Sequence, residues 1–394
     1  MKEGRKAATP RRCLGSEMKH SLALLGLVQA AACYQLGGSL AATRRFRQLP
    51  PRACAASTSA VAESVLMGSK PPALSLLAPA KINLFLRILG KRADGFHELS
   101  SLFQAVSLMD RLDFWQLPED EAAPLCSMEV TPDSLGAELI PTDASNLVMR
   151  ALQIFADRTG EKRRVHCRLH KEVPAQGGLG GGSADAATAL HAANRLAGFP
   201  VSEEELIIWG AELGSDVGFF LARGTAMCTG RGEFIEPLPP LPDCTVYLVK
   251  PDDGLSTPSV FKALGLKPDE SLPGPEPQEL LRQFQSDVST ASFVNDLEAP
   301  AYQVMPRLEQ LRDTLRSYGF AAVMMSGSGS TIFCIGAPRA DARGTWQQEL
   351  KAEYDVTVFE RAFCSRPADE KLWYGEWPMR GGSGGYHRMA GRLA

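Results

Sequence analysis

The segment PAQGGLGGGSADAATAL, residues 174–190, decides the fold, because five of the six residues from Gly177 to Gly182 are glycine. Glycine has no Cβ atom, so successive backbone N–H groups of such a loop can turn toward one point. After the loop, Ser183 is a good N-cap, and apolar residues recur at helical spacing with no proline before Pro200. A glycine loop that runs into a helix N-terminus presents unpaired donors and suits a phosphate. We therefore expect a nucleotide triphosphate site in this segment.

The loop alone leaves a simpler alternative open. Glycine runs also serve as linkers, and helices need caps whatever their role. The segment is not a Walker loop, because no Lys-Ser or Lys-Thr pair follows the glycines, and no strand of Rossmann type with an acidic residue at the expected distance is evident. Residues elsewhere in the chain must therefore decide between a phosphate site and a linker.

The composition is that of a globular protein with room for two domains. Of the 394 residues, 44% are hydrophobic and 22% are charged. Residues 1–70 carry 11 Lys and Arg against three acidic residues, so the remaining residues have a net charge of −11. Such an acidic body argues against a nucleic acid partner. The nine cysteines are scattered without a Cys-x-x-Cys pair, which argues against a disulfide or zinc framework.

Residues 1–70 have the layout of a targeting leader. A basic start precedes an apolar stretch at 21–33, as in a secretory signal, and a stretch rich in Ala, Ser and Thr follows at 53–62, as in a transit peptide. The tandem resembles the bipartite leader of proteins imported into plastids with extra membranes. A retained membrane anchor at 21–33 and a plain mitochondrial or chloroplast leader are the alternatives. We expect a mature chain that begins near residues 69–74, in a plastid and without membrane contact.

The first strand region of this mature chain contains two polar residues. The apolar run 74–89 predicts one or two strands, broken at Pro79. Lys81 and Asn83 interrupt the run, and their spacing of two puts both side chains on one face of a strand. A lysine within a strand more often lies at a solvated edge, which is the alternative. Further elements are expected as a strand pair over 102–117, helices at 146–159, 295–318 and 343–354, and strands at 164–173, 219–235, 245–249 and 356–363.

Asp216 is a second polar residue in a special position. It lies between two glycines at a helix end, just before an apolar pair, where it is either a turn residue that caps local N–H groups or a functional carboxylate. The proline-rich segment 237–243 predicts a domain boundary. Helices and strands mixed without strict βαβ alternation predict an α+β fold in both halves. Residues 367–394 are expected to form a flexible tail.

Six segments together resemble one family, the 4-diphosphocytidyl-2-C-methyl-D-erythritol kinases of the GHMP kinase superfamily. Any one segment would be weak, but they occur in the family's order and cover nearly the whole mature chain. The Pro-Ala-Lys-x-Asn and Ala-Asp-Gly-x-His patterns separate this family from its mevalonate, homoserine and galactose relatives. The six segments are residues 79–86, 92–99, 174–187, 214–220, 256–261 and 326–330.

The resemblance implies a fold and an activity. The fold would be the two-domain α+β GHMP kinase fold, with a leader at 1–70, a ribosomal-protein-S5-like N-terminal domain at 71–240 and a ferredoxin-like C-terminal domain at 241–366. The activity would be ATP-dependent phosphorylation of the 2-hydroxyl of 4-diphosphocytidyl-2-C-methyl-D-erythritol, in the non-mevalonate route to isoprenoid precursors. Another GHMP small-molecule kinase, for mevalonate, homoserine or a sugar, is the alternative. We expect a monomer or homodimer.

The resemblance also implies roles for particular residues. Asp216 matches the catalytic base and Lys81 the lysine that assists it, since an alcohol needs a base to accept its proton. ATP, with Mg²⁺ as its partner, would be bound by Pro174, Gly177, Gly178, Leu179, Gly180, Gly181, Gly182 and Ser183. The cytidine and methylerythritol ends of the substrate would contact Asn83, Phe96, His97 and Phe261. The chain departs from the family pattern at Phe96, usually tyrosine, at Gly218, commonly proline, and at Ala184, commonly serine.

Overall fold

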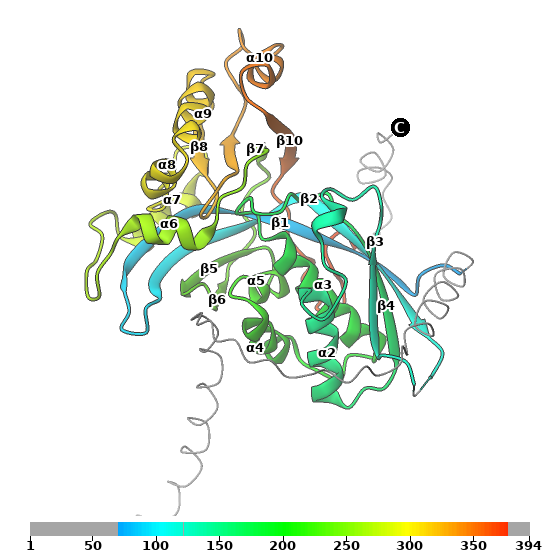
Figure 1. Ribbon diagram of the computed structural model, residues 1–394. Coiled ribbons are helices and arrows are strands. Elements are labelled where there is room, and N and C mark those ends of the chain that lie inside the picture. Colours follow the sequence, from blue (N-terminus) through cyan, green and yellow to red (C-terminus); the bar gives the residue numbers. More distant parts are fainter. Residues whose placement is uncertain (1–69, 121, 377–394) are drawn as a thin grey trace, which may run out of the picture. The chain divides into compact units, whose positions relative to one another are not determined.

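The computed structural model describes residues 70–120 and 122–376, and its helices and strands form two sheets with helices packed on them (Figure 1). The leader predicted at 1–70 lies outside the described residues except for Lys70. The first sheet runs in the order β3-β4-β2-β5-β6, and β1 pairs with β2. Its strands are β1 (Leu74–Lys91), β2 (His97–Leu117), β3 (Cys126–Val130), β4 (Arg164–His170), β5 (Thr225–Gly230) and β6 (Phe234–Pro237).

The long antiparallel hairpin of β1 and β2 is the centre of the fold, and it differs from the expectation. Residues 102–117 belong to one strand, so the predicted strand pair there is wrong. The chain reverses earlier, where Arg92 N donates to the carbonyl of Phe96 at 2.7 Å and Gly95 has a φ of +88°. Pro79 does not end β1. It lies at a register shift, where a residue without an N–H group can be accommodated.

Four helices cover one side of this hairpin. The amide of Asn146 caps α2 by accepting from Val148 N, and Ser202 and Glu205 form a capping box at the start of α4. These helices pack on the apolar side chains of the first sheet, and Phe155 of α2 and Leu190 of α3 share one core with Phe114 of β2. The helices are α2 (Leu147–Thr159), α3 (Gly181–Leu196), α4 (Glu203–Leu213) and α5 (Val217–Leu221), and a short 3₁₀ helix, η1 (Ala137–Leu139), precedes them.

The second sheet is antiparallel and has the strand order β10-β7-β9-β8. Its chain order, with helices between β7 and β8 and between β9 and β10, is the split βαβ arrangement of a ferredoxin-like unit. The predicted α+β fold is therefore confirmed. The strands are β7 (Thr245–Pro251), β8 (Ala322–Met325), β9 (Ile332–Ile335) and β10 (Val356–Ala362). The helices are α6 (Thr257–Leu264), α7 (Pro277–Ser286), α8 (Glu298–Val304), α9 (Pro306–Ser317) and α10 (Trp346–Glu353).

The two sheets share an apolar core. Side chains of the β1–β2 hairpin such as Ile82 and Val106 pack with Leu248 and Phe333 of the second sheet and with Phe284 of α7. Figure 1 shows α2 to α5 on one side of the hairpin and the second sheet with its helices on the other. The boundary predicted at residue 240 lies in the connection between β6 and β7 and stays a prediction. Among the described residues, no helix combines the length and apolar character needed to cross a membrane.

Part of the predicted flexible tail is packed on the rest of the chain, which corrects that expectation for the segment around Trp373. Trp373 is fully buried, its indole Nε1 donates to Leu77 O at 2.8 Å, and its ring stacks on His191 with 4.4 Å between centroids. Tyr374 is buried beside it. Two large aromatic side chains supply the apolar area that holds this segment on the first sheet. The glycine-rich remainder, residues 377–394, lies outside the described residues.

Candidate active site

The glycine segment is a tight loop attached to β1. Lys81 N donates to Leu179 O at 2.9 Å, and the Leu179 side chain is buried. Gly178 and Gly180 have φ angles of +73° and +71°, a region that favours glycine. A Cβ atom on Gly178 would lie 2.1 Å from Ser326 O. The glycine at position 178 is therefore required both by its backbone angle and by the approach of a second loop.

That second loop is Ser326–Ser330, between β8 and β9. The Ser326 hydroxyl donates to Gly178 O at 3.0 Å, and Thr331 N donates to Gly177 O at 3.2 Å. Gly327 lies against the first loop and against β1, since a Cβ atom there would be 3.2 Å from Asn83 Oδ1. The second loop supplied a motif of the family resemblance but was not expected among the site residues. Its contribution depends on packing between the two sheets, which the local sequence does not encode.

The helix after the glycine loop begins earlier than expected. The N-cap of α3 is Gly180, with no side-chain cap, and the helix starts at Gly181. Ser183 is therefore the third helical residue, and the prediction that it caps the helix is wrong. The first intrahelical bond of this end runs from Ala184 N to Gly180 O at 2.9 Å. The N–H groups of Gly181, Gly182 and Ser183 are thus left for a ligand, as a phosphate site requires.

Lys81 and Asp216 form an ion pair beside the glycine loop. Lys81 Nζ lies 3.4 Å from Asp216 Oδ2 and donates to Asn83 Oδ1 at 2.8 Å. It also lies over the ring of Phe103, 4.5 Å from the centroid. Lys81 is 4% exposed, so the alternative of a solvated edge lysine is wrong. A buried ammonium needs a partner, and Asp216 and Asn83 supply it.

Asp216 itself is positioned as a reactive group rather than as a cap. It occupies the N-cap position of α5, but its side chain makes no capping hydrogen bond. The side chain is 30% exposed and lines the cavity described next. Asn83, by contrast, has both ends of its amide occupied, because its Nδ2 also donates to Ser101 Oγ at 2.9 Å.

A cavity of about 700 Å³ lies where these parts meet. Its lining includes Lys81, Asn83, Asp216 and Phe261, and all of Pro174–Ser183. The cavity therefore brings together the predicted phosphate loop, the lysine and aspartate, and one predicted substrate contact. Helix η1 and the start of α2 contribute an apolar wall at Leu139 and Leu147.

Phe96 and His97 lie at the hairpin turn and do not line the cavity. Phe96 is 51% exposed. The His97 ring packs against Phe261, with 4.8 Å between centroids, and its Nε2 is buried without a hydrogen-bond partner among the described residues. Burial, with the charge of Lys91 second, lowers the pKa of His97. A neutral imidazole with a free nitrogen can accept or donate one hydrogen bond to a ligand.

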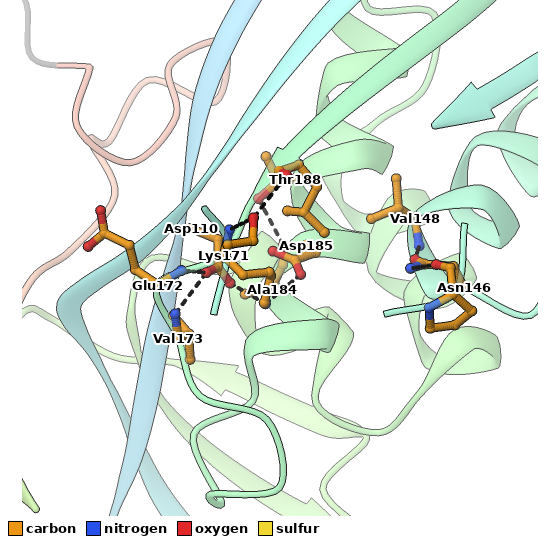
Figure 2. A network of polar contacts seen from close by, with 12 residues as sticks. Asp110, Asn146, Val148, Lys171, Glu172, Val173, Ala184, Asp185 and Thr188 are labelled. Carbon is orange, nitrogen blue, oxygen red and sulfur yellow. Dashed lines mark hydrogen bonds and ion pairs between the residues drawn. The ribbon is translucent and has the colours of Figure 1, made fainter. Parts of the chain in front are cut away.

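A buried charge cluster close to the start of α3 was not expected from the sequence (Figure 2). Lys171 Nζ contacts carboxylate oxygens of Asp110 and of Asp185, the latter at 2.7 Å. Asp110 Oδ1 also accepts from Glu172 N at 2.7 Å and Val173 N at 2.9 Å. A lysine at a strand end and an aspartate in an alanine-rich helix are the only signals that the sequence carries. Their contact depends on how α3 packs on β1 and β2.

The cluster has two carboxylates for one ammonium, which perturbs its titration. Burial raises the pKa of Asp185 to about 8, and the charge of Asp110 adds to this rise while Lys171 opposes it. Burial would lower the pKa of Lys171, but attraction to Asp185 and Asp110 outweighs it and raises that pKa. Asp185 is also part of the cavity lining, and its Oδ1 is buried without a hydrogen-bond partner among the described residues.

The fold and site match a known class of enzyme. Residues 146–224 match the N-terminal domain of the GHMP kinases, and residues 275–352 match their C-terminal domain. Together with a glycine loop, a helix N-terminus and an acid–lysine pair in one cavity, these matches define an ATP-dependent small-molecule kinase.

Close relatives narrow the class. A 4-diphosphocytidyl-2-C-methyl-D-erythritol kinase of Protochlamydia amoebophila is 43% identical over 77% of this chain and 94% of its own. The chloroplastic enzyme of that name from Arabidopsis thaliana is 43% identical over 77% of this chain and 76% of its own. A crystal structure of 4-(cytidine 5'-diphospho)-2C-methyl-D-erythritol kinase superposes with a TM-score of 0.60 at 31% identity, over 74% of this chain and 99% of that one. The chain belongs to the 4-diphosphocytidyl-2-C-methyl-D-erythritol kinase family.

Proposed function

We propose that this enzyme transfers the γ-phosphate of ATP to the 2-hydroxyl of 4-diphosphocytidyl-2-C-methyl-D-erythritol, in the non-mevalonate route to isoprenoid precursors. The observation that carries the proposal is the Lys81–Asp216 ion pair, which lies in the same cavity as the glycine loop. The names of the close relatives support the choice of acceptor. Another GHMP acceptor, such as mevalonate, homoserine or a sugar, is the alternative.

Asp216 is the proposed base. Its carboxylate is half-buried, reaches the cavity, and is not used to cap α5. An alcohol becomes a good nucleophile when a group within hydrogen-bond reach accepts its proton. Asp216 would take the proton of the acceptor hydroxyl as the oxygen attacks phosphorus.

Lys81 would act beside it. Its ammonium, 3.4 Å from Asp216 Oδ2, can hold this carboxylate in position and can offset negative charge on the transferring phosphoryl group. Asn83 and Phe103 hold the ammonium in place. Because both ends of the Asn83 amide are occupied, we assign Asn83 the role of orienting Lys81, in addition to lining the substrate cavity.

The glycine loop would bind the phosphates of ATP. The free N–H groups of Gly181, Gly182 and Ser183 point from the helix N-terminus, whose dipole also favours negative charge. Phosphoryl transfer leaves the protein little covalent work beyond such positioning and charge stabilisation. The second loop fixes the first one through Gly177 and Gly178.

Magnesium is the expected partner of ATP. The described part of the chain shows no group of three or more His, Cys, Asp or Glu that could hold a metal ion alone. Two residues of the cavity lining, Asp185 and Ser183, offer oxygen ligands of the kind Mg²⁺ prefers, and one carboxylate oxygen of Asp185 has no partner among the described residues. Mg²⁺ often uses one carboxylate together with substrate phosphates and water, so these residues fit it. When bound, it would neutralise phosphate charge.

The acceptor would occupy the rest of the cavity. Phe261 lines this part of the cavity and packs against the ring of His97, which lies just outside the lining. We assign the cytidine to this pair of rings, because aromatic side chains stack on bases and His97 Nε2 has no hydrogen-bond partner among the described residues. Phe96, the residue before His97 in the hairpin turn, is exposed enough to stack on a base. Pro174 to Ser183 face the cavity from the ATP side.

We also propose that the enzyme works in a plastid after removal of its leader, which the chloroplastic relatives support. Either a monomer or a homodimer is compatible with this function.

A panel of acceptors tests the proposed function. ADP release by the full chain is measured with 4-diphosphocytidyl-2-C-methyl-D-erythritol, mevalonate, homoserine and galactose at equal concentrations. We expect rapid ADP release with the first acceptor and background rates with the others. If one of the other acceptors is turned over with a higher kcat/KM, that acceptor is the substrate and the proposal is wrong.

A further inference from the structure

A cationic side chain at the cavity has no part in the mechanism above. Arg231 lies in the turn between β5 and β6 and lines the same cavity as Lys81 and Asp216. Its guanidinium lies over the ring of Phe96, with 4.8 Å between Cζ and the ring centroid. The next residue, Gly232, is close to the base, since a Cβ atom there would be 3.8 Å from Asp216 Oδ1. This turn therefore borders both the exposed aromatic ring and the candidate base.

The turn holds Arg231 in a defined orientation. The carboxylate of Glu233 accepts from the backbone N–H of Arg231 and, at 3.2 Å, from its Nε. Gly230 allows this carboxylate to fold back, because its φ is +73° and a Cβ atom there would lie 2.7 Å from Glu233 Oε2. Within the described residues, Nη1 and Nη2 of Arg231 have no hydrogen-bond partner. The guanidinium is thus fixed through Nε and its face, while its two outer nitrogens remain available.

The other cations of the cavity are already committed. In the described part of the chain, Lys81, Lys171 and Arg231 are the cationic residues of the lining. Lys81 bonds to Asn83 and pairs with Asp216, and Lys171 is held between two aspartates. Arg231 alone offers a pair of unused donors in the planar geometry that matches a phosphate.

We propose that Arg231 binds the diphosphate of the acceptor, with its two Nη groups donating to phosphate oxygens. This inference rests on the proposed function, in which the acceptor has a cytidine at one end and the reacting hydroxyl at the other. The diphosphate joins these two ends. The guanidinium of Arg231 contacts the ring of Phe96, and the next residue, Gly232, lies close to Asp216. Arg231 is therefore placed between the two ends of the acceptor, where the diphosphate would lie.

Steady-state kinetics of the full chain test this assignment. For Arg231→Met we expect the KM for 4-diphosphocytidyl-2-C-methyl-D-erythritol to rise about 10-fold, the lower end of the range for a hydrogen bond to a charged group, while the KM for ATP stays within about twofold. Arg231→Lys keeps the charge but loses the planar arrangement of donors, so its KM for the acceptor should lie between those of wild type and Arg231→Met. Competitive inhibition by CDP and by cytidine distinguishes binding of the diphosphate from binding of the base. CDP should inhibit Arg231→Met more weakly than wild type, and cytidine should inhibit both equally.

Arg158→Met is the matched control. Arg158 also lies over an aromatic ring, 5.1 Å from that of Trp209, and pairs with Glu212 at 2.7 Å, but it does not line the cavity. Its KM values should equal those of wild type. The assignment is wrong if wild type turns over the acceptor and Arg231→Met has an unchanged KM for it. It is also wrong if the substitution weakens inhibition by CDP and inhibition by cytidine equally. If wild type fails to turn over this acceptor at all, the proposed function is wrong.

Discussion

At the scale of single residues, the buried cluster of Lys171, Asp110 and Asp185 gives the clearest physical consequence. Its one ammonium cannot fully neutralise two carboxylates in a buried site. Asp110 is fixed by two backbone N–H groups, whereas Asp185 Oδ1 has no partner in the described structure. Without a bound metal ion, Asp185 is therefore the member that keeps a proton near neutral pH.

The cluster predicts a pH-dependent stability. The pKa of Asp185 is raised by folding, so the folded chain binds a proton that the unfolded chain releases near pH 4. The stabilisation is complete below that pH and is lost as the pH rises to about 8. Asp185→Asn should remove this decrease. The free energy of unfolding in urea is measured from pH 5 to pH 9 for wild type and for Asp185→Asn. Parallel curves for the two proteins would contradict this prediction.

A companion prediction concerns Lys171. Lys171→Met removes the one cation and leaves two buried carboxylates, which should lower the free energy of unfolding by about 3–5 kcal/mol at pH 7. Urea denaturation at pH 7 measures the loss. A change below about 1 kcal/mol, the size typical of an exposed pair, would show that water reaches the cluster.

At the scale of elements, the glycine loops act as a pair, and this predicts a specific defect. Gly178→Ala would force a Cβ atom to within 2.1 Å of Ser326 O at a positive φ, so the two loops must separate. We expect ATP binding to weaken more than acceptor binding. Gly344→Ala is the control, because a Cβ atom there meets nothing within 4 Å and the backbone angle is ordinary. Isothermal titration that shows equal losses for both ligands would contradict the assignment of the loop to ATP.

The elements also show how far the sequence could be interpreted. Helix α2 and strands β7 and β10 were predicted, because their periodicity and caps are local. The single strand β2 and the early start of α3 were not. Strand β2 is buried along most of its length by partners far away in the sequence, and α3 begins where Gly180 takes a left-handed conformation without any side-chain cap.

The candidate site divides in the same way. The glycine loop, Lys81, Asn83 and Asp216 were named from their residue types and from the family resemblance, and the structure brings them to one cavity. The structure adds three further parts of the site, which depend on contacts between segments far apart in the sequence. They are the second glycine loop, Lys171 and Arg231. The second loop was found as a motif of the family resemblance but without a role in the site, and nothing in the immediate sequence of Lys171 or Arg231 distinguishes them from ordinary turn or surface residues.

At the scale of the whole molecule, the packed segment after Pro367 predicts where the chain can be shortened. Truncation after Glu376 should leave stability unchanged, because it removes none of the described contacts. Truncation after Pro367 also removes Trp373 and Tyr374, and should lower the free energy of unfolding by at least about 3 kcal/mol. Thermal and urea unfolding of the two chains measure the difference. If the two truncated chains are equally stable, the prediction of a flexible tail over all of 367–394 is supported instead.

The central claim, that Asp216 is the base of a kinase whose ATP site is the glycine loop, is tested most directly by Asp216→Asn. Isothermal titration and single-turnover phosphoryl transfer are measured on the same preparation of the full chain, with 4-diphosphocytidyl-2-C-methyl-D-erythritol as acceptor. We predict ATP affinity close to that of wild type and a rate of transfer lower by about 100-fold or more. A near-normal rate of transfer with normal ATP affinity would contradict the claim.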